Sequence, residues 1–315
     1  MFTHMNYIYE VYKEHSFSKA AQNLYISQSS LSLTIKRAEE KIGMQIFDRS
    51  VYPIQLTEFG QHYINAVKEI RSITNNLTDY IYDVNHLKTG QLSIGAGNFF
   101  STYLVAPAIS RFKKQYPNIS VQLLEGRTFD LKHQLANGNI DILVTNGHLD
   151  PSIFKNILLF RERMVLVVPK SLMPELVCQE SLLTFEELSG NTPIRKPGVS
   201  LKHFEHLPFI GMRPGNDSRI RSDSMFADAD AEPNWMVELD QSSTAYRLAC
   251  DGMGYSIVTD SVITQLALPE TVYFYHIDHP KAFRDVCIYM RNIEYMPRTM
   301  EAFIRVLREP YQDIR

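Results

Sequence analysis

The stretch SFSKAAQNLYISQSSLSLTIKRAEEKIG, residues 16–43, determines the fold of the N-terminal region. It predicts two short helices joined by a tight turn at residues 25–27. Ser16 is a suitable N-cap for the first helix, residues 19–24, and Gly43 is a suitable C′ residue for the second. Before them, apolar residues at helical spacing between Met5 and Tyr12 predict one more amphipathic helix.

The second helix of this pair has two different faces. Its apolar positions recur at helical spacing and are expected to pack inward (Leu31, Ile35, Ala38 and Ile42). Polar residues at its start and off that stripe are candidates for contacts with nucleic-acid bases and phosphates: Ser27, Gln28, Ser29, Ser32, Lys36 and Arg37. This is the geometry of a helix-turn-helix, whose second helix enters a major groove.

Two short β-prone runs follow, residues 46–50 and 53–57, and they predict the wing of a winged helix-turn-helix. Arg49 in this wing is expected to neutralise a backbone phosphate, while Gln28 and Ser29 are expected at base edges. Residues 1–60 carry six Lys/Arg and six Asp/Glu, so charge alone does not select DNA. A solvated polar face is the alternative interpretation.

Residues 58–87 predict one long helix with a narrow apolar seam. The apolar positions alternate in steps of four and three over four heptads: Phe59, Tyr63, Ala66, Ile70, Ile73, Leu77, Tyr80, Val84 and Leu87. A helix packed only on its own domain usually has a wider apolar stripe, so the seam favours a dimerising helix. At 1.5 Å per residue the helix spans on the order of 40 Å.

From residue 91 to the end, β-prone and helical segments alternate. Strands are predicted at 92–94, 119–123, 140–144, 164–168, 208–212, 235–239, 256–258, 272–277 and 286–290, and helices at 103–115, 131–136 and 297–307. This rhythm is typical of doubly wound α/β sheets, and more than two hundred residues fit two such subdomains. Ligands of these folds bind beyond the carboxyl ends of the strands and between subdomains.

These patterns predict an α/β protein with three parts. Residues 1–57 form the winged helix-turn-helix, residues 58–88 the linker helix, and residues 91–315 a regulatory domain. The regulatory domain divides into subdomain I, about 91–161 and 268–315, and subdomain II, about 162–267.

Composition agrees with a soluble globular protein of about two domains. The 315 residues are 44% hydrophobic and 21% charged, with a net charge of −3. No uninterrupted apolar run is longer than that at residues 164–168, which is far shorter than the ~20 residues of a membrane-spanning helix. No secretory signal is visible, and three cysteines without metal-ligand spacing fit a reducing cytoplasm. Because the net charge is −3, the protein has no overall positive field, and any nucleic-acid contact must come from a local patch.

Motifs for catalysis are missing from the sequence. It contains no GxSxG, HExxH, GxxxxGK or CxxC, so we expect neither an enzyme nor a cofactor site. His203 with His206, and His276 with His279, have metal-ligand spacing but no third ligand near in sequence, and solvated histidines are the preferred interpretation. Cys250 and Cys287 lie in apolar contexts typical of buried, inert thiols.

The residues quoted from Ser16 to Ile35 resemble the N-terminal signature of LysR-type transcriptional regulators. The resemblance continues through residues 39–40, Gly43, 47–49 and 56–60, and the downstream layout is similar to the family's linker helix and two periplasmic-binding-protein-like subdomains. It implies a cytoplasmic homodimer or homotetramer that binds a dyad operator in double-stranded DNA. Leu33 departs from the family, in which many members carry arginine there, and residues 171–198 form a longer connection, expected to be a surface excursion.

For a small-molecule effector, the resemblance points to the loop after the first strand of the regulatory domain and to its counterparts. The candidate residues are Asn98, Ser101, Thr102, Thr128, Asn146, Asn216 and Ser243. Hydroxyls and amides near helix N-termini suit a small carboxylate or a similar anion, although each is as suitable for a helix cap. A solute-binding or transport protein is the alternative, because its fold would match the C-terminal part; the N-terminal head weighs against it.

Overall fold

The computed structural model describes residues 2–84, 90–173, 179–189, 194, 196–266, 270–292 and 296–311. Contacts divide the chain into two compact units, Met1–Ile81 and Tyr82–Arg315. We describe each unit by itself. Among the described residues, no helix combines the length and the apolar character needed to cross a membrane.

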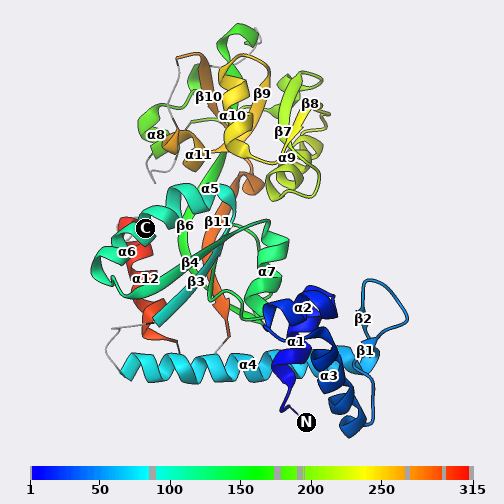
Figure 1. The fold of residues 1–315 in the computed structure, drawn as a ribbon. Coiled ribbons are helices and arrows are strands. Elements are labelled where there is room, and N and C mark those ends of the chain that lie inside the picture. Colours follow the sequence, from blue (N-terminus) through cyan, green and yellow to red (C-terminus); the bar gives the residue numbers. More distant parts are fainter. Residues whose placement is uncertain are drawn as a thin grey trace. The chain divides into compact units, whose positions relative to one another are not determined.

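The N-terminal unit, which we call the head, is a winged helix-turn-helix followed by a long helix (Figure 1). Its elements are α1 (Met5–Glu14), α2 (Phe17–Asn23), α3 (Gln28–Ile42), β1 (Phe47–Asp48), β2 (Gln55–Leu56) and α4 (Glu58–Val84). Ser16 and Ser27 cap α2 and α3 by accepting from the backbone N–H of Lys19 and Ser30. Gly43 ends α3 at φ 84°, a left-handed conformation that favours glycine. Phe47 pairs with Leu56 to form the antiparallel wing.

The first turns of α4 belong to the core of the head. Tyr63, Ile64 and Val67 are buried there with residues of α1, α2 and α3. Ile64 and Val67 lie beside the predicted seam, so this part of the apolar stripe is wider than the heptad pattern indicates. Ile73 is 68% exposed. The seam residues from Leu77 onward lie outside the side chains that the structure describes.

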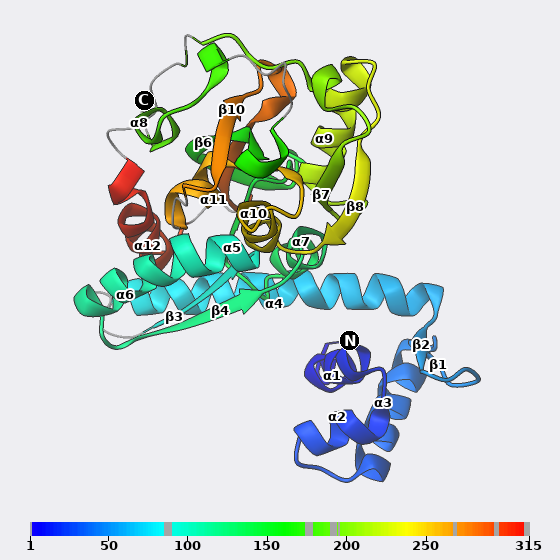
Figure 2. The same cartoon turned by 90° about the horizontal axis from the view of Figure 1, so that it is seen from above.

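The C-terminal unit, which we call the regulatory domain, holds two groups of parallel strands. The first group contains β3 (Gly90–Ala96), β4 (Ile119–Glu125) and β5 (Ile142–Thr145), and the second contains β7 (Pro208–Met212), β8 (Asn234–Leu239) and β9 (Tyr255–Thr259). Helices α6 (Ala106–Gln115), α7 (Thr128–Ala136) and α12 (Arg298–Arg308) pack on the first group. Helices α9 (Asp217–Asp228) and α10 (Ser242–Cys250) cover opposite faces of the second (Figure 2).

Two long strands, which we call the crossing strands, join the two groups. They are β6 (Phe154–Pro169) and β11 (Phe283–Arg291), and they run antiparallel to each other through the middle of the domain (Figure 1). The strand order among the described residues is β4-β3-β5-β11-β6-β9-β7-β8. The sheet is mixed, because the two parallel groups are joined by antiparallel strands. The 16 residues of β6 are enough for it to pair in both subdomains.

One subdomain boundary and one connection differ from the prediction. Strand β10 (Val272–His276) pairs with residues 165–169 of β6, so the chain is still in subdomain II at residue 276 and returns to subdomain I only with β11. The described part of the connection at 171–198 is not a loose excursion. Leu183 and Leu188 are buried in the core beside β10, and the Leu183 N–H donates to the Phe274 carbonyl at 2.8 Å.

Candidate nucleic-acid interface and regulatory cleft

The outer face of α3 carries the residues that were predicted to contact nucleic acid. Gln28, Ser29, Lys36 and Arg37 are exposed, and Ser32 is half-buried. The Gln28 Oε1 accepts a hydrogen bond from the Ser18 hydroxyl at 2.9 Å, which orients the side chain and leaves its amide NH₂ available. Ser27 is occupied as the N-cap.

The wing is attached to α3 through a buried carboxylate. Glu39 is 7% exposed, and its Oε1 accepts from the backbone N–H of Ile46 at 2.8 Å and of Phe47 at 3.2 Å. Its Oε2 accepts from the Arg49 guanidinium at 2.8 Å. Arg49 also lies 5.2 Å above the Phe17 ring. Arg49 therefore positions the wing, a role that the sequence analysis did not assign to it.

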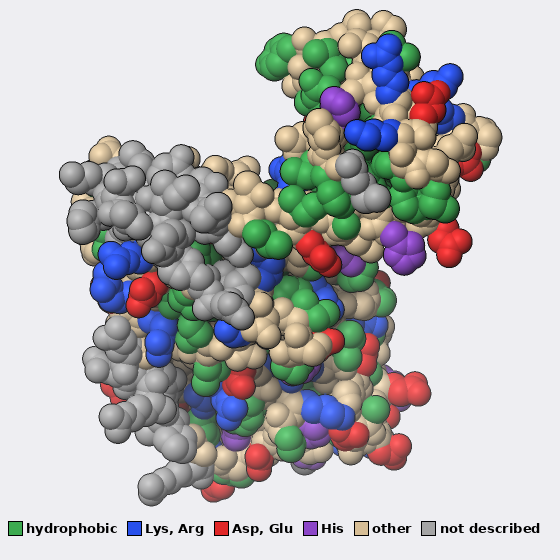
Figure 3. Space-filling model, turned by 90° about the horizontal axis from the view of Figure 1, so that it is seen from below, with side chains coloured by type: hydrophobic (Ala, Val, Ile, Leu, Met, Phe, Trp, Pro, Cys, Tyr) green, Lys and Arg blue, Asp and Glu red, His purple; other side chains and the backbone are tan. Residues whose placement is uncertain are grey.

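The described basic side chains do not form a separate patch on the face seen in Figure 3. On the face that Figure 3 shows, Lys/Arg and Asp/Glu side chains are interspersed. Leu33 is 49% exposed on α3 between the polar candidates. Hydrogen-bonding geometry, rather than a strong positive field, is what this helix offers to DNA.

Most hydroxyls of the predicted effector set are occupied within the protein. Ser101 is fully buried and donates to the Ala96 carbonyl at 3.2 Å, while Thr102 donates to the Asn98 carbonyl at 2.9 Å. The Thr128 hydroxyl lies 3.1 Å from that of Thr145.

The two candidates from subdomain II lie at helix starts. Asn216 is the N-cap of α9 and accepts from the Ser218 N–H at 2.9 Å. Ser243 is half-buried in the first turn of α10. Of the whole predicted set, Asn146 alone lines the cleft described next.

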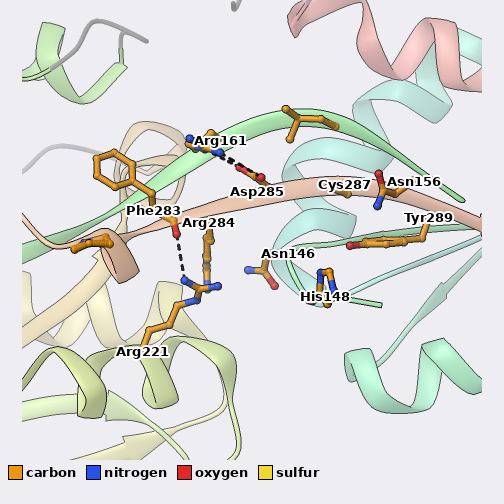
Figure 4. Close-up of a pocket in the computed structure, with 13 residues that line it drawn as sticks. Asn146, His148, Asn156, Arg161, Arg221, Phe283, Arg284, Asp285, Cys287 and Tyr289 are labelled. Carbon is orange, nitrogen blue, oxygen red and sulfur yellow. Dashed lines mark hydrogen bonds and ion pairs between the residues drawn. The ribbon is translucent and has the colours of Figure 1, made fainter. Parts of the chain in front are cut away.

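A cleft of about 560 Å³ lies on the crossing strands (Figure 4). Its floor consists of three facing pairs from β6 and β11, Arg161 with Asp285, Leu158 with Cys287, and Asn156 with Tyr289, and of Phe283. One wall is the loop after β5, with Asn146 and His148, and the other contains Arg221 of α9 and Pro280. The walls thus come from different subdomains.

Arg284 lies at the base of the cleft and is held by a buried network. Its Nε donates to Glu162 at 2.6 Å, and its Nη1 donates to Asp217 at 3.2 Å and to the Ser218 hydroxyl at 2.8 Å. Glu162 is 1% exposed and also accepts from the Asn146 amide at 3.3 Å and from the Ser261 hydroxyl. This glutamate therefore connects both crossing strands to both subdomains.

Asp217, which accepts from Arg284, also holds Arg221 beside that arginine. The Arg221 Nε donates to Asp217 at 2.9 Å, and its Nη1 donates to the carbonyls of Lys281 and Phe283, both at 3.1 Å. On the floor, Arg161 forms an ion pair with Asp285 at 2.7 Å. The guanidinium groups are therefore fixed in place before any ligand binds.

Arg163 of β6 forms another ion pair, with Asp260 at 3.5 Å. Burial raises the pKa of Asp260 to about 6, and the nearby charge of Glu162 acts in the same direction.

Burial also raises the pKa of the Cys250 and Cys287 thiols, in agreement with the prediction of inert cysteines. Among the described side chains, no three His, Cys, Asp or Glu residues gather as a set that could hold a metal ion.

Two family descriptions match this chain. The "Bacterial regulatory helix-turn-helix protein, lysR family" matches residues 2–61, and the "LysR substrate binding domain" matches residues 85–312. The chain belongs to the LysR family of transcriptional regulators.

Relatives of this LysR-family chain extend over nearly its whole length. It is 30% identical over 298 residues to a probable RuBisCO transcriptional regulator of Cyanidium caldarium, covering 91% of this chain and 87% of the relative. It is 29% identical over 310 residues to the uncharacterized regulator YcgK of Bacillus subtilis (strain 168), covering 97% and 93%.

Solved structures of the family share the fold. Full-length OxyR from Pseudomonas aeruginosa superposes with a TM-score of 0.70 at 20% identity, over 98% of this chain and 95% of OxyR. CbnR in complex with its target DNA gives 0.59 at 18% identity, over 98% and 99%. These likenesses show the architecture of the chain.

Sequence reasoning missed the arginines of this regulator's cleft. Arg161, Arg221 and Arg284 come from three separate segments, and none lies in a recognisable motif. A usable signal was present in Arg284, a charged residue beside the apolar run predicted at 286–290. Charged residues inside buried strands need partners, which marks them as candidates for a polar network.

Proposed function

We propose that this LysR-family regulator binds a dyad operator as a homodimer or homotetramer, and that a small anionic effector in the regulatory domain alters how it does so. Bases are read by Gln28 and Ser29, and phosphates are contacted from Lys36, Arg37 and Arg49. The observation that carries this proposal is the exposed polar face of α3, held in position by the Ser27 cap and by the Glu39 contacts to the wing.

Self-association is supported by α4. Ile73 exposes 68% of its surface on this helix, whereas Tyr63 and Val67, closer to its start, are buried in the head. A large apolar side chain on a long amphipathic helix is stabilised when a second helix covers it. A second copy of the same chain, related by a two-fold axis, also fits a DNA site with two half-sites.

The effector part of the proposal is supported by the cleft on the crossing strands. Its walls come from both subdomains, and fixed guanidinium groups favour an anion. A cytoplasmic location follows from the proposed role. Regulation rather than transport or catalysis is the activity that the family membership favours.

Footprinting of the purified full chain on DNA flanking its own gene tests this function. We expect protection of two half-sites with their centres about one helical turn, or a multiple of it, apart. Protection should disappear in the Gln28→Ala, Ser29→Ala double variant and persist in Gln22→Ala, an exposed glutamine on α2. Uniform coverage of all DNA, or no binding, would contradict the proposal.

A further inference from the structure

We propose that the cleft on the crossing strands binds a monocarboxylate with a compact apolar body, and that Arg221 and Arg284 hold its carboxylate group. As an effector site this rests on the proposed function, but the binding itself does not. The predicted effector set contributes only Asn146 to this cleft, so the inference assigns a different set of side chains.

The donors for a carboxylate are present and unused. Hydrogen bonds of the described residues occupy Nε and Nη1 of both arginines, and none involves Nη2 of either. An Nη2 group without a hydrogen-bond partner is either buried and unpaired or open to solvent. Neither of these two groups is among the buried, unpaired atoms of the described residues, so both are open to solvent. Because both arginines bind the same Asp217 Oδ2, the two groups lie at one end of the cleft (Figure 4). Two planar donors fixed side by side suit the two oxygens of a carboxylate.

The charge balance favours one negative charge rather than two. Arg161, Arg221 and Arg284 are matched by the three carboxylates that pair with them, Asp285, Asp217 and Glu162. A monoanion gains charge-assisted hydrogen bonds from the free donors. Because no arginine of the cleft is left unmatched, hydrogen bonds alone compensate the ligand's charge, and a dianion such as phosphate gives up the hydration of two charges where a monoanion gives up that of one.

The apolar part of the ligand is indicated by the floor. Leu158 is 51% exposed and Phe283 is 39% exposed, both on the crossing strands and both lining the cleft. An inorganic ion or acetate would leave these side chains in water, whereas a ring or branched chain would cover them. The cleft therefore combines a polar end with an apolar floor, as small-molecule sites generally do.

The position of the cleft gives such a ligand a means of control. Arg221 belongs to α9 of subdomain II, whereas Asn146 and His148 belong to the loop after β5 in subdomain I. A ligand that contacts both walls binds best in one arrangement of the two subdomains. Differential affinity of this kind is what shifts a regulator between two states.

Calorimetric titration of the full chain tests the ligand class with four probes. Phenylacetate carries the carboxylate and the apolar ring, 2-phenylethanol lacks the charge, acetate lacks the ring, and inorganic phosphate is the multiply charged ion. We expect saturable binding of phenylacetate, and affinity at least tenfold weaker for each of the other three. Absence of saturable phenylacetate binding up to ~10 mM, or equal affinity for acetate or phosphate, would overturn the inference.

Matched variants test the residues. Arg221→Gln should weaken phenylacetate binding at least tenfold, because it removes one of the two free donor groups. Arg247→Gln is the control, since Arg247 also pairs with an aspartate four residues away on a helix but lies outside the cleft. Leu158→Asn, at an exposed position, should reduce the preference for phenylacetate over acetate. Unchanged affinity in Arg221→Gln would overturn the site.

Operator binding measured without ligand separates this inference from the proposed function. If wild type and Arg221→Gln bind the operator equally while Arg221→Gln binds phenylacetate as tightly as wild type, the site is wrong and the regulator remains. If phenylacetate binding depends on Arg221 but wild type protects no specific DNA, the site stands and the proposed function fails.

Discussion

Both units of the chain contain a nearly buried glutamate at a junction between elements, Glu39 in the head and Glu162 in the regulatory domain. Glu39 is 7% exposed and Glu162 is 1% exposed, and each accepts an arginine at less than 3 Å. The partners of Glu39 are all within ten residues of it. Glu162 instead finds Ser261 and Arg284, which are 99 and 122 residues away in the chain.

This difference explains which features could be predicted from the sequence. In the head, the helix caps, the exposed polar face of α3 and the wing are set by contacts between neighbours in the chain, so the pattern of residues 16–57 predicts their positions. The cleft depends on contacts between distant segments. The spacing of Asp217 and Arg221 on α9 is local, but nothing near either residue indicates that Arg284, 67 residues away, also binds Asp217. Only the tertiary fold brings Arg221 and Arg284 together at Asp217.

The largest expected effect is the loss of the distant network. Glu162→Ala leaves the Arg284 guanidinium in a buried position without its main counter-charge, and we expect a loss of ~3–5 kcal/mol in the free energy of unfolding of the regulatory domain. Urea unfolding followed by fluorescence of Trp235, the single tryptophan of the chain, measures it, because Trp235 packs against Phe209 and Phe226 in this domain. The control is Glu186→Ala, an exposed carboxylate in the same unit. A loss below ~1 kcal/mol would show that the network is not a major support.

A smaller loss is expected for the local junction. Glu39→Ala leaves two backbone N–H groups of the wing without an acceptor and should cost the head ~2–4 kcal/mol. The ion pair with Arg49 adds less, since that arginine is 39% exposed. Amide hydrogen exchange at Ile46 and Phe47 measures the effect.

The control for Glu39→Ala is the same substitution at the neighbouring Glu40. Glu40 is exposed and pairs with Lys36 at only 3.9 Å, so Glu40→Ala should change stability by less than ~0.5 kcal/mol. The Trp235 transition should stay unchanged in Glu39→Ala. If that transition moves with the exchange rates at Ile46 and Phe47, the two units do not unfold separately and the comparison fails.

Within the regulatory domain, strands were predicted better than helices and connections, since α9 and α10 were not predicted as helices. The strand predicted at 208–212 is found at those residues, because an apolar run between turn residues specifies it locally. The apolar run at 164–168 is part of a strand that begins at Phe154. Exposed Lys155, Asn156 and Leu158 do not alternate regularly with buried residues, so the start of this strand has no clear periodicity. Likewise, residues 272–276 read as a strand, but only pairing with β6 places them in subdomain II.

The claim that α3 reads bases has one direct test, the binding of Gln28→Ala to the footprinted operator and to random DNA at one salt concentration. We predict a loss of ~1–3 kcal/mol on the operator and little change on random DNA. Gln22→Ala should match wild type on both, whereas Arg37→Ala, on the same face, should weaken both. An equal loss on operator and random DNA for Gln28→Ala would contradict the account.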